Sequence, residues 1–171
     1  MPCSFCYYAN MACKPNFAFH AIYHFAFLYR ILDFTHNLKK NLLDGSSTAT
    51  FLLPYISKLD SVVLFTNNIL TALDAIEMGI RTHCIGGNSI NGSPVLSGLE
   101  AYSGISGIYA DILFFSSQSL DKNGVISDST EEENYLTSLM LNSSQKRVFL
   151  CDSGKFNTHS LFTLAAIDDI E

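Results

Sequence analysis

The stretch LLDGSST, residues 42–48, carries the strongest signal for the fold. Two leucines that end a short strand are followed at once by an aspartate, a glycine and three hydroxyl residues. This order is typical of a buried strand that turns sharply into the N-terminus of a helix. The helix is expected to extend to about Lys58 with a kink near Pro54, because proline interrupts a helix.

The same order of strand, turn and helix repeats along the rest of the chain. Thr130 and Glu133 form a capping box, residues 88–94 are expected to form a polar hairpin, and residues 116–129 a loop. Apolar strands that alternate with helices predict an α/β fold, a Rossmann-like, mostly parallel sheet with helices on both faces. The expected strands are 61–65, 80–85, 95–96, 111–115 and 147–151, and the expected helices are 69–78, 99–109 and 130–141.

The carboxyl ends of these strands carry most of the candidate ligand-binding residues. In a parallel sheet such ends meet at one edge, where ligands bind. Backbone N–H groups at a helix N-terminus favour an anion, Lys155 adds a compact positive charge, and Thr66 and Asn67 suit sugar hydroxyls. For Asp111, a role in stabilising the sheet is as consistent with its position as contact with a ligand. The candidate ligand-binding residues are Asp44, Gly45, Ser46, Ser47, Thr48, Thr66, Asn67, Gly86, Gly87, Asp111, Asp152 and Lys155.

Composition separates residues 1–40 from residues 41–171 and excludes several classes of protein. The 171-residue chain is 48% hydrophobic and 15% charged, which fits one folded domain and excludes extensive disorder. Residues 41–171 carry a charge balance of −9, against +3 for residues 1–40. An acidic body repels a phosphate backbone, so this chain by itself is not expected to bind DNA. No catalytic residue, metal or cofactor is expected.

Residues 1–40 are expected to form a leader rich in aromatic residues, cysteine and histidine, without a recognisable DNA-binding motif. Cys3, Cys6, His20 and His24 approach the spacing of a Cys2His2 zinc site. The helix of such a site would be apolar here rather than basic, so an apolar leader helix around residues 17–33 is the simpler interpretation.

Membrane attachment and secretion are not expected. The apolar part of the leader is too short and too interrupted for a membrane span, and no signal cleavage site follows it. Cys84 and Cys151 lie within apolar runs and are expected to be reduced core residues. These features predict a cytoplasmic protein.

Seven short motifs, in this order, resemble the C-terminal effector-sensing domain of DeoR-family bacterial transcriptional regulators. They are LLDGSST (42–48), LFTNN (64–68), CIGG (84–87), SGLEA (97–101), ADILFFSSQ (110–118), SDSTEEE (127–133) and FLCDSGKF (149–156). The fold of that family is shared with ribose-5-phosphate isomerase, glucosamine-6-phosphate deaminase and CoA transferases.

The resemblance implies a sensor of a phosphorylated sugar or related metabolite. Binding would alter the operator affinity of an attached winged helix-turn-helix domain, as in a repressor, and the sensor domains would assemble into a homo-oligomer. Residues 41–171 are expected to be this effector-sensing domain, truncated at its end. Residues 1–40 show no helix-turn-helix pattern with a basic recognition helix.

A sugar-phosphate isomerase or deaminase on the same fold is the alternative. Proton transfer on an open-chain sugar needs a carboxylate base beside the bound carbonyl and usually a second acid. Asp111 is the candidate base, but no further carboxylate or histidine is expected near Ser116-Ser117-Gln118. A structural remnant without a ligand is the third interpretation.

Overall fold

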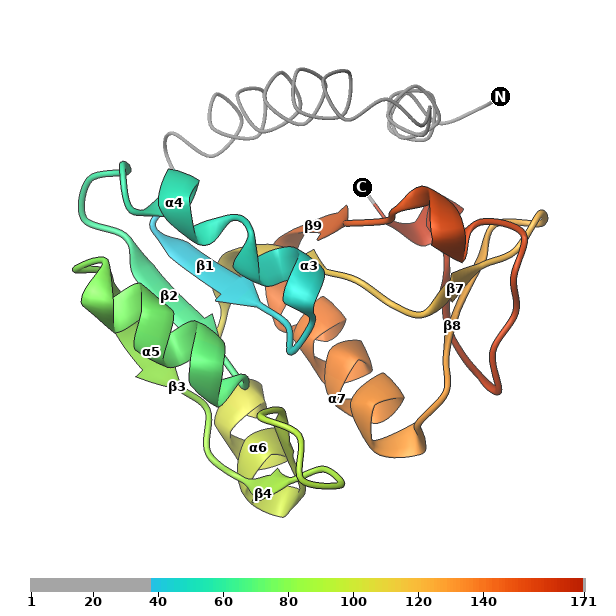
Figure 1. The fold of residues 1–171 in the computed structure, drawn as a ribbon, viewed down its shortest axis with the longest axis horizontal. Helices are drawn as coiled ribbons and strands as arrows, with labels where there is room; N and C mark the ends of the chain where they lie inside the picture. Colours follow the sequence, from blue (N-terminus) through green and yellow to red (C-terminus); the bar gives the residue numbers. More distant parts are fainter. Residues whose placement is uncertain (1–37, 171) are drawn as a thin grey trace.

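The central sheet has five strands in the order β3-β2-β1-β6-β9, and all of its pairings are parallel (Figure 1). The order reverses between β1 and β6, because the chain moves outward from β1 to β3 and then returns to the other side of β1. The predicted α/β, Rossmann-like sheet is confirmed. In the computed structural model, which describes residues 38–170, the strands are β1 (Lys40–Leu43), β2 (Val63–Thr66), β3 (Arg81–Cys84), β6 (Ala110–Phe115) and β9 (Ser144–Phe149).

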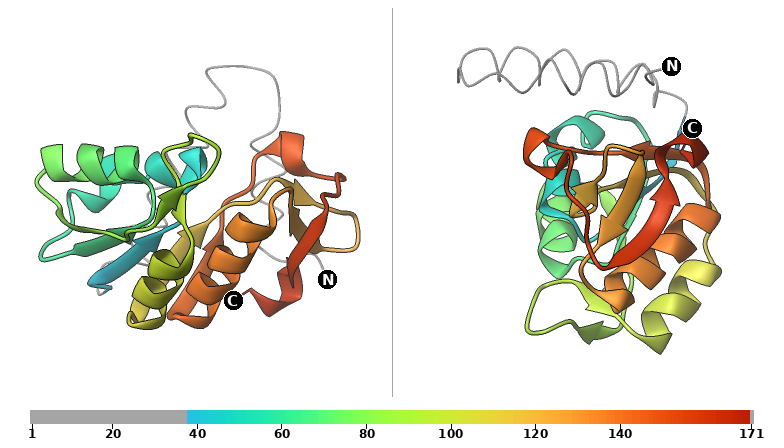
Figure 2. Two further views of the ribbon diagram at one scale, coloured as in Figure 1. Left: turned by 90° about the horizontal axis from the view of Figure 1, so that it is seen from below. Right: turned by 90° about the vertical axis from the view of Figure 1, so that its right-hand side faces the viewer.

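Helices cover both faces of this sheet, as predicted (Figure 2, left). One face carries α3 (Ser47–Thr50), α4 (Leu53–Ile56) and α5 (Ile69–Glu77), and the other carries α6 (Leu99–Ser106) and α7 (Glu131–Asn142). Successive residues of a strand point to opposite faces, so Leu43 belongs to the core under α3–α5 and Leu42 to the core under α6 and α7. Burial on both faces explains why the strands appear in the sequence as continuous apolar runs.

Local sequence explains where the helices begin. The Asn68 Oδ1 accepts the N–H groups of Leu70 and Thr71 at 3.0 and 3.2 Å and so caps α5. Before α7, the Thr130 hydroxyl donates to the Glu133 carboxylate at 2.9 Å. The two residues of the predicted capping box therefore meet, through their side chains rather than through the backbone.

The helix expected from the LLDGSST turn to about Lys58 divides into the two short helices α3 and α4. Pro54 lies in the first turn of α4, where a proline is tolerated because no N–H of that turn has a partner within the helix. Proline therefore begins a second helix here instead of kinking one long helix.

A second, smaller sheet is not predicted by the sequence. It consists of β7 (Ser119–Leu120), β8 (Val125–Asp128) and β10 (Phe162–Ala166), in the antiparallel order β10-β8-β7. Two of its strands lie in the segment expected to be a loop, and β10 follows the last expected strand. By contrast, β4 (Asn88–Ser89) and β5 (Leu96–Ser97) pair around the predicted polar hairpin.

Two further predictions concern cysteines and the leader. Cys84 is exposed, so the prediction that it is a core residue is wrong. Cys151 is half-buried and packs against the core under α6 and α7. Cys84 ends β3, an edge strand whose outer side carries no neighbour within the described residues.

The zinc pattern and the helix of residues 17–33 lie outside the described residues. Within residues 38–170, no helix is long and apolar enough to cross a membrane.

Candidate ligand-binding site

The carboxyl ends of β1, β6 and β9 meet where the strand order reverses, which is where ligands bind in open α/β sheets. Asp44 follows β1, Ser116 follows β6, and Lys155 lies in the short helix η1 (Ser153–Lys155) after β9. The Lys155 Nζ donates to Ser116 Oγ at 2.7 Å. The N–H of Ser116 in turn donates to Asp44 Oδ2 at 2.8 Å. Hydrogen bonds therefore connect all three strand ends.

Asp44 is buried and holds the turn after β1. Its Oδ1 accepts the N–H of Ser46 at 3.1 Å and the Ser46 hydroxyl at 2.5 Å. Burial raises the pKa of Asp44 to about 6, although these hydrogen bonds, that of Ser116 and the charge of Lys155 lower it. Both carboxylate oxygens are occupied by donors from the protein, so Asp44 acts as a positioning residue for the turn.

The turn after β1 leaves backbone donors free. The Ser46 hydroxyl accepts the N–H of Ala49 at 3.2 Å and caps α3. The N–H groups of Ser47 and Thr48 open this helix and have no partner within it. No other described residue accepts a hydrogen bond from them. Two free donors therefore lie on the turn that Asp44 holds.

The end of β2 adds an unused acceptor. Asn67 is 2% exposed; its Nδ2 donates to the Leu96 carbonyl at 2.9 Å, but its Oδ1 has no partner within the described residues. Thr66 is fully buried, and its Oγ1 accepts the N–H of Asn68 at 3.2 Å. Asn68 also donates from Nδ2 to the Gly45 carbonyl at 2.9 Å. Thr66 and Asn68 thus shape the turn, whereas the Oδ1 of Asn67 is buried beside it without a partner among the described residues.

Carboxylates surround the ammonium of Lys155. Asp152 Oδ2 lies 3.9 Å from Lys155 Nζ, and Asp152 Oδ1 accepts the N–H of Gly154 at 2.8 Å to cap η1. Asp128, at the end of β8, is also close enough for Lys155 to lower its pKa. Burial nevertheless raises the pKa of Asp128 above its ordinary value, despite hydrogen bonds from the N–H groups of Ser129 and Gln118.

Ser116 and Asp128 lie at the site although the sequence does not predict them there. Ser116 follows β6 within a run of serines, and nothing in that run distinguishes one hydroxyl from the next. Asp128 lies on a strand that was expected to be loop. The order of the strands brings both residues to the ends of β1 and β9, and only the sheet topology reveals this.

Asp111 is not brought to this site. It lies at the amino-terminal end of β6, whereas the site lies at the carboxyl ends of the strands. There its Oδ2 accepts the N–H groups of Lys39 and Lys40 at 2.8 and 3.0 Å. Lys40 Nζ is 3.5 Å from the other carboxylate oxygen. Partial burial raises the pKa of Asp111, but the two hydrogen bonds and the charge of Lys40 prevail and lower it. Asp111 therefore braces the entry of β1.

Gly86 and Gly87 follow β3, the strand farthest from the reversal point on that side of the sheet. Gly87 has a φ of 141°, and a Cβ on it would collide with the carbonyl oxygen of Ser97. This conformation and close approach explain the glycine without a ligand.

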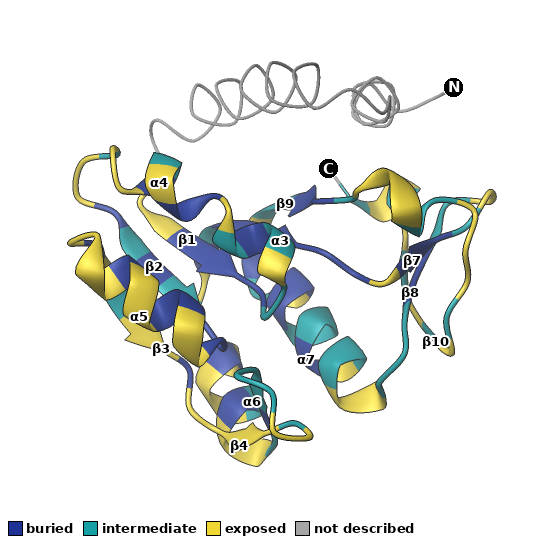
Figure 3. Ribbon diagram, viewed as in Figure 1, coloured by how far each residue is buried: buried dark blue, intermediate teal, exposed yellow. Residues whose placement is uncertain are grey.

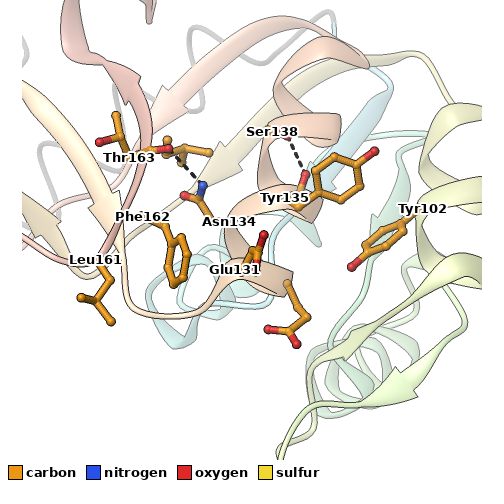
Figure 4. Close-up of a pocket in the computed structure, with 10 residues that line it drawn as sticks. Tyr102, Glu131, Asn134, Tyr135, Ser138, Leu161, Phe162 and Thr163 are labelled. Carbon is orange, nitrogen blue, oxygen red and sulfur yellow. Dashed lines mark hydrogen bonds between the residues drawn. The ribbon is translucent and has the colours of Figure 1, made fainter.

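A separate open groove lies between α7, β10 and Tyr102 of α6, with a volume of about 620 Å³ (Figure 4). Tyr102 and Tyr135 pack edge to face with ring centroids 4.9 Å apart. The lining includes Glu131 and Glu132 and no lysine, arginine or histidine. This groove has no positive side chain to pair with a phosphate, so the site around Lys155 is the better candidate for an anion.

Comparisons with known proteins agree with this fold. A family model described as the DeoR C terminal sensor domain matches residues 34–171. Ribose 5-phosphate isomerase from Plasmodium falciparum is similar with a TM-score of 0.50 and 19% identity, over 77% of this chain and 51% of that chain. A D-ribose-5-phosphate isomerase solved in complex with phospho-erythronic acid has a TM-score of 0.50 and 12% identity, over 75% and 51%.

The chain thus spans about half the length of the solved structures it matches. At these identities the likeness shows the fold alone. A comparison with curated proteins found no match.

Proposed function

Because the chain belongs to the DeoR C-terminal sensor domain family, we propose that it senses a phosphorylated sugar or a related small metabolite. Binding of this effector would control DNA binding by an attached winged helix-turn-helix domain, as in a cytoplasmic repressor. The observation that carries the proposal is the contact of Lys155 Nζ with Ser116 Oγ at the point where the strand order reverses.

In this proposal the effector's phosphate binds between Lys155 and the turn after β1. Lys155 supplies a positive charge, and the N–H groups of Ser47 and Thr48 are donors without a partner among the described residues. A hydrogen bond to a charged group contributes about 1.5–3 kcal/mol. The half-buried position of Lys155 reduces screening by water and so favours the upper part of this range.

The sugar is placed toward the end of β2. Asn67 carries a buried acceptor that no described residue uses, and a small movement of the turn after β2 would expose it to a sugar hydroxyl. The ends of β2 and β6 are separated by two interstrand spacings, about 10 Å. This distance is comparable to the length of a five- or six-carbon sugar phosphate, so one ligand would contact both Asn67 and Lys155.

Calorimetric titration of the full chain with a panel of sugar phosphates and the matching free sugars tests the proposal. We expect a phosphate ester to bind and its free sugar to bind far more weakly. Lys155→Ala should weaken binding by about ten- to a hundredfold, since 1.4 kcal/mol corresponds to one decade. Ser47→Ala should weaken binding less, because the backbone donor stays in place.

Lys122→Ala is the matched control. Lys122 is exposed in the turn between β7 and β8, so the variant removes the same charge away from the site and should bind like the wild type. Equal binding of free sugars and phosphates, or no effect of Lys155→Ala, would show that the anion site is elsewhere. Failure of every compound to bind would favour a remnant without a ligand.

The isomerase or deaminase alternative gains one observation from the structure. Burial raises the pKa of both Asp44 and Asp128, and the charge of Lys155 lowers both values in part. Two carboxylates, the number that proton transfer on a sugar usually needs, therefore lie near Lys155. Against an acid–base role, donors of the protein occupy both oxygens of Asp44. We expect binding without turnover when ribose 5-phosphate or glucosamine 6-phosphate is incubated with the protein and analysed by NMR.

A further inference from the structure

One side of α7 lines the open groove between this helix, α6 and β10. Residues at intervals of three and four share one side of a helix, and the lining residues of α7 that do so are Glu131, Asn134, Tyr135 and Ser138. Tyr102 of α6 and Phe162 of β10 line the groove from the other two elements (Figure 4). Its volume of about 620 Å³ is within the range of small-molecule sites, about 300–1,000 Å³.

Aromatic rings form a corner in this groove. The rings of Tyr102 and Tyr135 stand at 85° to each other with their centroids 4.9 Å apart. The face of each ring carries the negative part of its quadrupole. Ser97 is buried and donates to the Tyr102 hydroxyl at 3.3 Å, which holds this ring in position. The corner therefore favours a cation over an anion.

Two carboxylates of the groove have no counter-charge. Glu131 and Glu132 are exposed in the first turn of α7 (Figure 3), and within residues 38–170 no side chain forms an ion pair with either. Acidic residues stabilise the start of a helix, but Glu133 already supplies a carboxylate there, which accepts the Thr130 hydroxyl at 2.9 Å. The lining has no lysine, arginine or histidine, so two negative charges remain uncompensated.

A buried acceptor beside the groove is also unused. Asn134 Nδ2 donates to the Thr163 carbonyl at 3.0 Å and so joins α7 to β10. Its Oδ1 is buried without a partner among the described residues, which is costly for a polar atom. A small movement of β10 would expose this oxygen to an N–H donor in the groove. The groove thus lacks donors and positive charge, and it has acceptors and negative charge in excess.

We propose that the groove binds an organic polycation with a hydrocarbon chain, an aliphatic diamine or polyamine. Its ammonium groups would meet the two glutamates and the faces of the tyrosine rings, and its chain would lie on Leu161, which is 82% exposed, and Phe162. The charge balance of −9 over residues 41–171 raises the local concentration of such cations. None of the groove residues belongs to the site around Lys155, so this proposal does not depend on the proposed effector.

A metal ion and a basic peptide are less well matched to this groove. Within residues 38–170, no three side chains of histidine, cysteine, aspartate and glutamate are placed to hold a metal ion. The aromatic and apolar lining also suits a hydrocarbon chain better than a strongly hydrated ion. The volume is that of a small-molecule site, which favours a short polyamine over a peptide segment.

Titration of the full chain with spermidine, followed through the backbone amide resonances in NMR spectra, tests the proposal. The resonances of residues 131–138 and 161–164 should shift and saturate. Exposed ion pairs and cation–π contacts are individually weak, so we expect a dissociation constant of about 0.1–1 mM. Octanediol, an uncharged chain of similar length, and magnesium chloride at equal ionic strength should produce no saturating shift there.

Variants separate this groove from the general negative charge of the protein. Glu131→Gln/Glu132→Gln should weaken spermidine binding about two- to thirtyfold. Asp74→Asn/Glu77→Gln is the matched control, because it removes two exposed carboxylates from α5 on the other face of the sheet. Tyr135→Leu should weaken binding about two- to fivefold, whereas Tyr135→Phe keeps the ring face and should bind like the wild type.

Several results would overturn the proposal. Wild-type resonances of residues 131–138 that do not move with spermidine would do so without reliance on any variant. Equal weakening by the two double variants would show that spermidine responds to overall charge alone. Saturation of the same resonances by magnesium chloride, equal effects of Tyr135→Phe and Tyr135→Leu, or binding of a tetralysine peptide in place of spermidine would each exclude a polyamine site.

Discussion

At the scale of single residues, Asp44 couples stability to pH. Burial favours its protonated form, so its folded-state pKa of about 6 lies above the ordinary value of 3.8. The folded protein therefore holds this proton more tightly than the unfolded chain. The resulting stabilisation is complete below about pH 4 and is lost as the pH rises through about 6. For a shift of about two units it amounts to up to about 3 kcal/mol.

Asp44→Asn removes this titration. The free energy of unfolding of the wild type, relative to the variant, should therefore fall by up to about 3 kcal/mol between pH 4 and pH 7. Urea unfolding at several pH values measures the difference. Asp74→Asn, on the exposed face of α5, is the control for loss of one carboxylate. A difference that is constant across pH would contradict the assignment.

Asn41 is a second residue whose environment makes a prediction. Its side chain is 0% exposed in the central strand β1, and neither its Oδ1 nor its Nδ2 has a partner among the described residues. A buried amide without hydrogen bonds costs about 1–3 kcal/mol. Asn41→Leu, of similar size, should therefore raise the free energy of unfolding by about this amount in urea. A loss of stability would show that the amide is hydrogen-bonded.

At the scale of elements, the β1–α3 turn depends on the β4–β5 hairpin. A Cβ on Gly45 would lie 2.7 and 2.9 Å from the two methyl groups of Val95, in the connection between β4 and β5 and directly before β5. Gly45→Ala should therefore destabilise the protein by about 1–3 kcal/mol, as overpacking does, and weaken effector binding. Val95 has few alternative rotamers, so it is not expected to move aside.

The double variant Gly45→Ala/Val95→Ala tests this packing. Removing the valine methyl groups makes room for the new Cβ, so the double variant should be more stable than the sum of the two single changes predicts. Coupled neighbours typically differ from additivity by about 0.5–3 kcal/mol. Additive changes in urea unfolding would show that strain at Gly45 does not come from Val95.

At the scale of the whole molecule, the two cores share one sheet. Leu42 and Leu43 of β1 belong to different cores, so both faces are expected to unfold together. An effector that binds only the folded state at 100 times its dissociation constant adds about 2.7 kcal/mol. We expect a single thermal transition that moves up by about 5–10 °C. Lys155→Ala at the same ligand concentration should lose about half of the shift or more, whereas Lys122→Ala should keep it.

The sequence by itself determined the local helices and strands and the order of the motifs that follow the strands. Apolar runs that alternate with helices identified the five strands of the main sheet, and Asn68 marked the start of α5 through a cap that depends only on neighbouring residues. The ends of β1, β2 and β9 were recognisable because aspartate, asparagine, glycine or hydroxyl residues follow an apolar run directly.

Tertiary structure alone decided which ends of the strands these residues occupy and what they meet. Asp111 lies at the amino-terminal end of its strand, whereas Asp44 follows the carboxyl end of β1, so the two residues lie on opposite sides of the sheet. Ser116 and Asp128 reach Lys155 only because β6 lies beside both β1 and β9 and β8 folds back nearby. Contacts between segments distant in sequence depend on strand order, and strand order has no local signal, so no pattern of neighbouring residues predicts this site in full.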